Sequence, residues 1–480
     1  MLKYKRNIDF FSYLFFDFQA AKNAPDEKRA KFLPRTARGG IIIKCENDNE
    51  TTQNTQTRQE KGFGVFSPEK SMKYILVIGD GMADNPLKVL GGETPLQAAN
   101  IPAIDRLAAE GTLGSVLTVP EGFPPGSDTA IMSIFGSAPQ TYYAGRAPLE
   151  AAAQGVELGE GDAAMRCNNV ALSEGAHFGD RRILSHSGGG IEGEDGRELV
   201  TWLFAHPDFR PLAEEARMEI YPTDSYRHIA VLRGADIRGL TLSPPHNHIG
   251  ETVSANLPSG SPAAAPLCAL LERACALLED HPLNRERAAL SKLPANGIWF
   301  WAGGTAARLQ DFTKTYGKTG AVVSAVPLCH GIAKLSGLDV LLVPGATGEL
   351  HTNYEGKVAA ALGALDTRDF VAVHLEGPDE CSHAGDLPGK LQAIEWLDSR
   401  VVAPLTRALE ERGEDFRLLL LSDHKTLLEE RGAHGGGSVP FLLYDSRKKS
   451  GSNLPYCEES AKNGPFLEDG TALMPLLFAE

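Results

Sequence analysis

The chain of 480 residues has no apolar run near the roughly 20 residues that cross a bilayer, and no closely spaced cysteine pair. Its seven cysteines are scattered and odd in number, which favours a reducing cytoplasm over an oxidising compartment. An excess of positive charge is also missing, because the formal net charge is -15. Nucleic acids and anionic membranes attract clustered cations, so we expect neither as a partner.

The first 71 residues carry little of the pattern of a folded domain. Lys3 and Arg6 precede an aromatic run at 10–16, but acidic residues flank this run and no small-residue cleavage site follows, unlike a secretory signal. Residues 44–71 are polar and poor in apolar side chains, a composition that predicts disorder. We therefore expect 1–71 to be a disordered extension ahead of the folded protein.

Short apolar runs alternate with helical patterns from residue 74 onward, which is typical of a parallel α/β sheet. Strands are predicted at 74–78, 115–119, 321–323, 340–343, 370–375 and 418–421. Pro102 opens an amphipathic helix that Gly111 ends, and a longer helix is expected over 390–411. The predicted fold class is therefore α/β, with a mainly parallel sheet flanked by helices.

The middle of the chain differs from its two flanks. Residues 151–310 are richer in glycine, proline, histidine and arginine, and their candidate strands are unevenly spaced. We interpret this stretch as an inserted, smaller α+β domain. The core is then built from 72–150 and 311–448, and 449–480 is a weakly patterned tail.

Acidic and histidine residues follow three of the predicted strands. Asp80 follows the first, Asp379 and His383 follow 370–375, and Asp423 and His424 follow 418–421. Parallel strands present their carboxyl ends at one edge of a sheet, so these side chains should converge. A single aspartate after a strand is more often a turn residue or a helix cap. Three such clusters together predict a site for divalent ions such as Zn, Mn or Mg, which carboxylates and imidazoles bind.

Ser127 is the candidate nucleophile. It follows the rigid turn 124–126 (PPG) and precedes an expected helix, so it would lie at a helix N-terminus, where the dipole and free N–H groups favour a phosphate. From spacing alone, a serine here is at least as often an ordinary helix cap. A metal ion beside the hydroxyl would promote loss of its proton and make it nucleophilic without a histidine base.

Five short segments resemble the archaeal-type cofactor-independent phosphoglycerate mutases, a family that also occurs in bacteria and belongs to the alkaline phosphatase superfamily. They are 79–84 (GDGMAD), 92–99 (GETPLQAA), 124–128 (PPGSD), 143–150 (YAGRAPLE) and 344–348 (PGATG). The resemblance extends over 72–445. It implies an alkaline-phosphatase-like core and interconversion of 2-phosphoglycerate and 3-phosphoglycerate through a phosphoserine, independent of 2,3-bisphosphoglycerate.

The resemblance also implies roles for single residues. One of two divalent ions (Mn, Mg, Zn or Co) would be bound by Asp379, His383 and His434. The other would be bound by Asp80, Asp423 and His424, with Ser127 beside it. Substrate-binding candidates are Asp128, Arg146, Arg166, Arg227 and Lys318. The arginines offer bidentate contacts to carboxylate or phosphate, although each could equally be a surface salt-bridge partner.

Two positions depart from the family's pattern. The family usually has a proline after the Asp-His pair and a threonine after the last metal histidine, whereas this chain has Lys425 and Gly435. A glycine run at 435–437 would hold His434 less rigidly. We expect this to affect catalytic efficiency more than metal binding.

The same core chemistry would serve other reactions, so alternative functions stay open. The nearest are a metal-dependent phosphatase and a homoserine-kinase-like phosphotransferase. A non-catalytic protein that binds a small molecule would be expected to have lost metal ligands, yet all the expected ligands are present. We expect a cytoplasmic enzyme with a small phosphorylated substrate.

Overall fold

A computed structural model of the protein describes residues 71–449 and 451–479. The predicted disordered extension lies outside the described residues, apart from Ser71. Within the described residues, no helix combines the length and the apolar character needed to cross a membrane.

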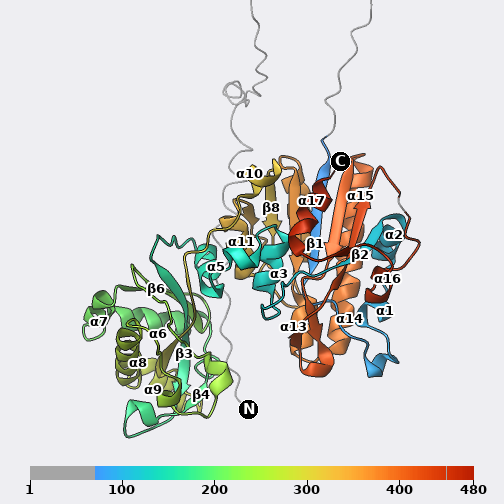
Figure 1. The fold of residues 1–480 in the computed structure, drawn as a ribbon. Coiled ribbons are helices and arrows are strands. Elements are labelled where there is room, and N and C mark those ends of the chain that lie inside the picture. The colour runs from blue at the N-terminus through green and yellow to red at the C-terminus, as the bar shows by residue number, and fades with distance from the viewer. Residues whose placement is uncertain (1–70, 450, 480) are drawn as a thin grey trace, which may run out of the picture. The chain divides into compact units, whose positions relative to one another are not determined.

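An eight-stranded, mostly parallel sheet forms the centre of the fold, in the order β15-β2-β14-β11-β1-β10-β8-β9 (Figure 1). β1 lies in the middle and pairs in parallel with β10 and β11, whereas β14 is antiparallel to both of its neighbours. This confirms the predicted fold class. The strands are β1 (Lys73–Gly79), β2 (Thr112–Val116), β8 (Gly320–Val323), β9 (Asp339–Leu341), β10 (Phe370–Leu375), β11 (Phe416–Leu421), β14 (Val439–Asp445) and β15 (Phe466–Leu467).

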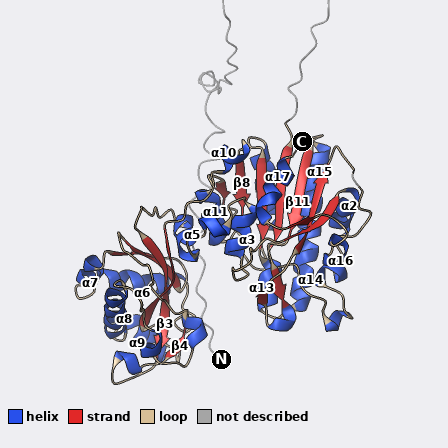
Figure 2. Ribbon diagram, viewed as in Figure 1, coloured by secondary structure: helices blue, strands red, loops and turns tan. Residues whose placement is uncertain are grey.

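The central strands are nearly continuous apolar runs because both faces of the sheet are covered. Ile75, Leu76 and Val77 of β1 are consecutive and fully buried, as expected for a parallel strand between two layers of helices. The helices that contact the strands include α2 (Pro102–Glu110), α11 (Pro327–Leu335) and α17 (Leu473–Phe478), which Figure 2 labels, and also α12 (Tyr354–Leu365). α2 begins at Pro102 and ends before Gly111, as predicted.

The long helix predicted over 390–411 is interrupted. It consists of α14 (Leu387–Trp396), a π-helical segment η6 (Leu397–Val402) and α15 (Ala403–Glu411). Pro404 lies at the start of α15 and has no N–H to donate, so the preceding turn widens instead of continuing as α-helix.

Two predicted strands are shifted, and the tail is more regular than its sequence indicates. β2 spans Thr112–Val116 rather than 115–119, because the chain then turns and Thr118 Oγ1 donates to the carbonyl oxygen of Asp423. β9 ends at Leu341 rather than at 343. In the tail, β15 pairs with β2 and α17 packs against β11.

A second, antiparallel sheet lies within 151–310. β3 (Ala163–Leu172) pairs with β4 (Ile183–Ser185), β6 (Arg227–Leu232) and β7 (Gly297–Thr305), and β6 pairs with β5 (Met218–Tyr221). Helices α6 (Gly193–Ala205) and α8 (Ala264–Leu278) supply Leu199, Leu203, Leu267 and Leu271 to a hydrophobic cluster with this sheet. The cluster is separate from the core of the large sheet, and the division into a core and an inserted domain stays a prediction.

Candidate metal centre

Three adjacent strands bring the candidate ligands to one edge of the large sheet. Asp80 follows β1, and Asp423 and His424 follow β11. Asp379 lies in α13 (Gly377–His383), which begins two residues after the end of β10. Because β1 pairs in parallel with both other strands, all three chain segments leave the sheet at the same edge.

Asp379, His383 and His434 form the first group, here called the outer group, with ligand atoms within 4.8 Å of one another. His383 Nε2 lies 3.1 Å from Asp379 Oδ2, because the two residues are one helical turn apart on α13. His434 belongs to β13 (Ala433–Gly435), and its Nε2 lies 3.1 Å from His383 Nε2. The three residues predicted to bind one ion thus lie together.

Asp80, Asp379 and His424 form the second group, here called the inner group, again within 4.8 Å. The resemblance implies Asp423 at this ion and Asp379 at the outer ion alone, whereas in the structure Asp379 belongs to both groups. Asp423 is adjacent: its Oδ1 accepts from the N–H groups of Gly81 and His424, and its Oδ2 lies 3.3 Å from His424 Nε2.

Two buried carboxylate oxygens at the inner group lack a hydrogen-bond partner among the described residues. They are Asp80 Oδ1 and Asp423 Oδ2. Both face the same imidazole nitrogen, since His424 Nε2 lies 3.6 Å from Asp80 Oδ1 and 3.3 Å from Asp423 Oδ2. Unpaired anionic oxygens are costly in a protein interior, and a cation bound here would satisfy them. This donor set fits a divalent metal ion.

The charges of the site also favour a bound cation. Burial raises the pKa of Asp80 well above its usual value, and the neighbouring charges of Asp423 and Asp379 raise it further. Burial also acts to raise the pKa of Asp379, but hydrogen bonds from His383 and His434 outweigh this and lower it. A cation between these carboxylates would relieve their mutual repulsion.

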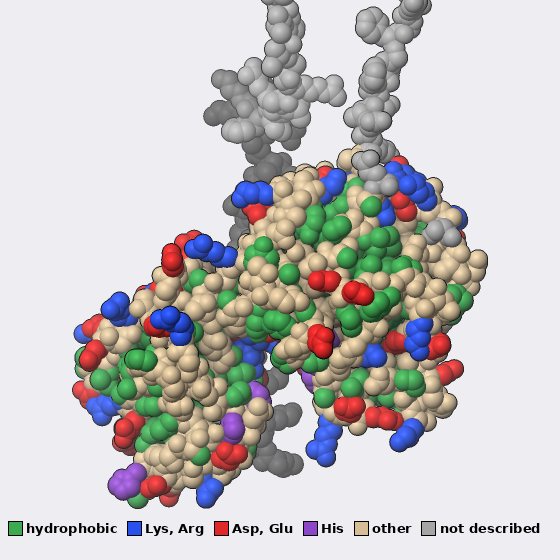
Figure 3. Space-filling view, viewed as in Figure 1, with side chains coloured by type: hydrophobic (Ala, Val, Ile, Leu, Met, Phe, Trp, Pro, Cys, Tyr) green, Lys and Arg blue, Asp and Glu red, His purple; other side chains and the backbone are tan. Residues whose placement is uncertain are grey.

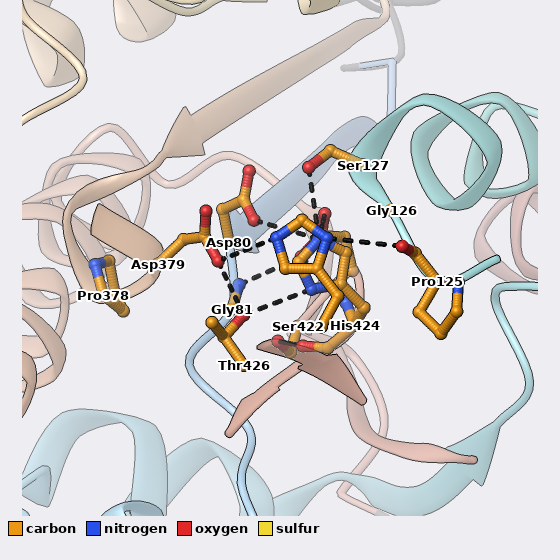
Figure 4. Close-up of polar contacts among 12 residues, drawn as sticks. Asp80, Gly81, Pro125, Gly126, Ser127, Pro378, Asp379, Ser422, His424 and Thr426 are labelled. Atoms are coloured by element: carbon orange, nitrogen blue, oxygen red, sulfur yellow. Dashed lines mark hydrogen bonds and ion pairs between the residues drawn. The ribbon is translucent and has the colours of Figure 1, made fainter. Parts of the chain in front are cut away.

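Ser127 lies beside the inner group. It is the first residue of α3 (Ser127–Ile134), and its hydroxyl oxygen is 3.1 Å from His424 Nε2 (Figure 4). Gly126, not Ser127, occupies the position that precedes the helix, so the hydroxyl is not engaged as a helix cap. The residue is 8% exposed, and it therefore has a sheltered hydroxyl at a helix N-terminus.

A hairpin anchored by a buried ion pair begins directly after His424 and carries His434. β12 (Lys425–Leu427) pairs with β13, and the buried Lys390 donates to Asp84 Oδ2 at 2.9 Å and to the carbonyl oxygen of Thr426 at 2.8 Å. Thr426 Oγ1 in turn donates to Asp379 Oδ1 at 2.6 Å. Sequence reasoning missed Lys390 and Thr426. Asp84 lies in the segment 79–84 (GDGMAD), which was the available sequence signal for this ion pair.

Gly81 allows this close packing. Its φ is +61°, and a Cβ atom at this position would lie 2.6 Å from Asp379 Oδ1. Any other residue would be strained in backbone and side chain, so the second glycine of 79–84 has a steric role at the ligands.

The two departures from the family's pattern face each other across the hairpin. Lys425 and Gly435 are register partners in β12 and β13, and Lys425 Nζ donates to Asn85 Oδ1 at 3.1 Å. A Cβ atom on Gly435 would lie 2.9 Å from a methyl group of Leu427, so a threonine would not fit here without movement of Leu427. The glycine therefore lies within a paired strand that carries His434.

The arginine candidates divide between two roles. Arg146 and Arg227 line a cavity of about 490 Å³ together with Glu150 and Glu376. Arg166 is buried, and its guanidinium is bound to Glu150 through two nitrogens. Among the described residues, Arg227 Nε has no hydrogen-bond partner although it is buried. Arg146 and Arg227 therefore lie at the cavity, whereas Arg166 is not among the residues that line it, and substrate binding by these arginines stays a prediction.

Asp128 and Lys318 have different surroundings from those predicted. Asp128 directly follows Ser127 in the sequence, and its Oδ2 accepts a hydrogen bond of 2.6 Å from the Tyr143 hydroxyl. Lys318 precedes β8, at the amino ends of the strands, and its Nζ lies 4.9 Å from the ring centre of Tyr74. A strand of six residues spans about 20 Å. The site is at the other end, so the prediction that Lys318 contacts the phosphate is wrong.

A mainly parallel α/β sheet with carboxylates, imidazoles and a serine gathered at its strand ends is typical of a metal-dependent phosphotransfer enzyme. Comparison with known proteins gives the family. The family model described as 2,3-bisphosphoglycerate-independent phosphoglycerate mutase matches residues 108–284. The protein of that name from Methanosarcina acetivorans is 45% identical over 395 residues, which are 82% of this chain and 96% of the relative. The chain therefore belongs to the 2,3-bisphosphoglycerate-independent phosphoglycerate mutase family.

Two solved structures share this fold. A protein from Pyrococcus horikoshii aligns with a TM-score of 0.68 and 29% identity, covering 85% of this chain and 97% of that chain. The cofactor-independent phosphoglycerate mutase from Thermoplasma acidophilum aligns with a TM-score of 0.56 and 27% identity, covering 85% of this chain and 98% of that chain. Because each alignment covers 85% of this chain, both extend beyond the large sheet into 151–310.

Proposed function

We propose that this chain interconverts 2-phosphoglycerate and 3-phosphoglycerate, with Ser127 as the transient phosphate carrier and two divalent ions bound by the inner and outer groups. The observation that carries the proposal is the position of the Ser127 hydroxyl, 3.1 Å from His424 Nε2 and beside two unpartnered, buried carboxylate oxygens. The relatives' activity as isomerases supports the same reading.

The chain's own residues suit phosphoryl transfer. Ser127 Oγ loses its proton and forms a bond to phosphorus while the bond from phosphorus to the glycerate oxygen breaks, and that oxygen takes up a proton. The second hydroxyl of the bound glycerate then loses its proton and attacks the phosphoserine, the bond from phosphorus to Oγ breaks, and Oγ takes up a proton again. The ions, which Mn, Mg, Zn or Co would provide, would favour the serine alkoxide and neutralise the phosphoryl oxygens.

Arg146 and Arg227 are the groups that would hold glycerate between the two transfers. Each guanidinium can bind a carboxylate or phosphate through two N–H groups, and both line the same cavity. Holding glycerate there and excluding water would prevent hydrolysis of the phosphoserine, which would turn the mutase into a phosphatase. Asp128 stays a candidate contact beside Ser127.

Acid trapping tests the proposal. The protein is incubated with labelled 3-phosphoglycerate, without bisphosphoglycerate, with each of the four metals in turn, and quenched in acid. We expect phosphoserine at residue 127, and formation of 2-phosphoglycerate in an enolase-coupled assay. Ser127→Ala should abolish both signals. Ser133→Ala is the matched control, because Ser133 is buried on the same helix outside both ligand groups, and it should retain both.

Other outcomes identify the alternatives. Release of inorganic phosphate in place of 2-phosphoglycerate would indicate a phosphatase, and transfer to homoserine would indicate a kinase-like phosphotransferase. Substantial mutase activity in Ser127→Ala would contradict the phosphoserine mechanism.

The cytoplasmic location and the absence of nucleic-acid partners stay predictions. On the face in Figure 3, lysine and arginine side chains are spread out with acidic side chains between them.

A further inference from the structure

A histidine stands inside one of the most apolar strands of the sheet. His374 is the fifth residue of β10 and is 2% exposed, and its register partner on β1 is Ile78. Burial of an imidazole among apolar side chains is unfavourable unless its nitrogens are hydrogen-bonded. The residue was not among the sequence-predicted site residues, because a polar side chain in a buried strand gives no motif.

Both ring nitrogens of His374 have partners, and the partners determine its tautomer. Nε2 lies 3.0 Å from Asp80 Oδ2, and Nδ1 lies 3.2 Å from the hydroxyl oxygen of Ser324. With a cation bound beside it the Asp80 carboxylate is ionised and can only accept, so Nε2 carries the proton and donates it to Asp80. In the neutral ring Nδ1 then accepts from the Ser324 hydroxyl, whose oxygen accepts from the N–H of Val326.

This contact distinguishes the two oxygens of Asp80. Oδ2 is occupied by the imidazole, whereas Oδ1 is buried, has no hydrogen-bond partner among the described residues and faces His424. We propose that His374 is a positioning residue that binds Asp80 Oδ2 and thereby presents Oδ1 to the ion of the inner group. The inference rests on the metal centre of the proposed function, and not on the identity of the phosphorylated substrate.

Further hydrogen bonds hold the backbone on either side of this contact. Lys357 of α12 is buried, and its Nζ donates to the carbonyl oxygen of His374 at 3.0 Å. His330 Nε2 lies 2.8 Å from the carbonyl oxygen of Ser324. Ser324, His374 and Asp80 thus form a line across the neighbouring strands β8, β10 and β1. Hydrogen-bonded partners of this kind orient metal-binding carboxylates, and their loss typically lowers metal affinity about 10–100-fold.

The test separates the hydrogen bond from the volume of the ring. In His374→Gln the amide nitrogen can donate from near the place of Nε2, whereas His374→Leu fills the site without a donor. Metal-free samples of the parent and both variants are titrated with Co²⁺, followed by calorimetry and by the visible spectrum of the bound ion. We expect His374→Leu to bind one of two ions about 10–100-fold more weakly with an altered spectrum. His374→Gln should stay close to the parent at both ions.

Two results would overturn the inference. One is parent-like binding of both Co²⁺ ions by His374→Leu; the other is equal weakening in both variants. If His374→Leu does not fold, the tautomer of His374 in the parent decides. It is measured by ¹⁵N NMR, and the His374 signal is assigned as the one missing in His374→Gln. We expect the proton on Nε2, and a proton on Nδ1 would contradict the proposal. If His374→Leu shows the expected loss of Co²⁺ affinity but the parent forms no phosphoserine, the proposed function is refuted and this inference stays intact.

Discussion

The inner and outer groups share Asp379 but lie in different surroundings. The His424 side chain of the inner group is 1% exposed, whereas the His383 side chain of the outer group is 41% exposed. Asp80 and His424 of the inner group follow the paired strands β1 and β11. Asp80 is hydrogen-bonded by His374, and the adjacent Asp423 accepts from two backbone N–H groups. The outer histidines lie at the end of a helix and on a hairpin.

This difference separates two tasks. Charges interact more strongly where water is excluded, so an ion at the inner group would act strongly on the adjacent Ser127 hydroxyl. An ion at the outer group would keep coordination positions open to solvent, and thus to the phosphoryl oxygens of an incoming substrate. We expect the two groups to respond differently to substitution, except where they share a residue.

Removal of the shared carboxylate should have the largest effect. Asp379→Asn supplies one neutral oxygen to both groups, so we expect loss of both ions and roughly a 10³-fold fall in mutase activity. Metal content by atomic emission and the enolase-coupled assay measure these effects. Glu380→Gln, on the same helix but outside both groups, should keep the parent's metal content. Retention of a full inner ion in Asp379→Asn would show that the groups do not share this ligand.

Asp423→Asn should affect one group only. Asp423 Oδ2 lies next to His424, so its replacement by an amide should release the inner ion, leave about one ion per chain, and lower activity roughly 10²-fold. His383→Ala is the counterpart at the outer group and should release the more exposed ion instead. The two variants are compared by Mn²⁺ titration. Two retained ions in Asp423→Asn would contradict its assignment.

Lys390→Met should weaken both groups together and destabilise the fold. It leaves the Asp84 carboxylate buried without its ion partner, which costs about 3–5 kcal/mol. Urea denaturation of the metal-free protein measures this loss. The double variant Lys390→Met with Asp84→Leu removes both charges and should recover much of the stability. A single variant as stable as the parent would show that the pair does not anchor the hairpin.

The smallest expected effect is a pH dependence of Mn²⁺ affinity at the outer group. It is measured in Asp423→Asn, because only the outer ion is expected to remain in that variant. The hydrogen bond to Asp379 raises the pKa of His383, so below this raised pKa a proton occupies the nitrogen that must bind the ion. Mn²⁺ affinity should therefore be full above that pKa and fall up to about tenfold per pH unit below it. Titrations between pH 8 and pH 6 measure the slope, and a flat profile would exclude His383 as a ligand.

The sequence predicted the strand ends that carry ligands, but not how the side chains divide between the two groups. Asp80, Asp379, His383 and His424 could be found because polar residues that follow apolar runs are visible in one dimension. The sharing of Asp379 could not, because it depends on side-chain orientations held by Thr426 and His383.

Three further differences have specific physical causes. His374 was hidden inside a strand pattern, and only the structure shows what its ring contacts. Lys318 was misplaced because a residue before a strand lies at the opposite edge from one after it. The break between α14 and α15 follows from Pro404, whose effect on a helix depends on whether the preceding turn can widen.

The central place of β1 sets the order in which the protein can be assembled. β1 ends at Gly79, but its neighbours β10 and β11 begin at Phe370 and Phe416. At about 5–20 residues per second, roughly 15–60 s of synthesis separate β1 from its first partner. The antiparallel sheet within 151–310 is made within that interval, and its strands pair with one another. Ribosome-bound chains that end before β10 should therefore combine a protease-resistant segment at 151–310 with a protease-sensitive β1.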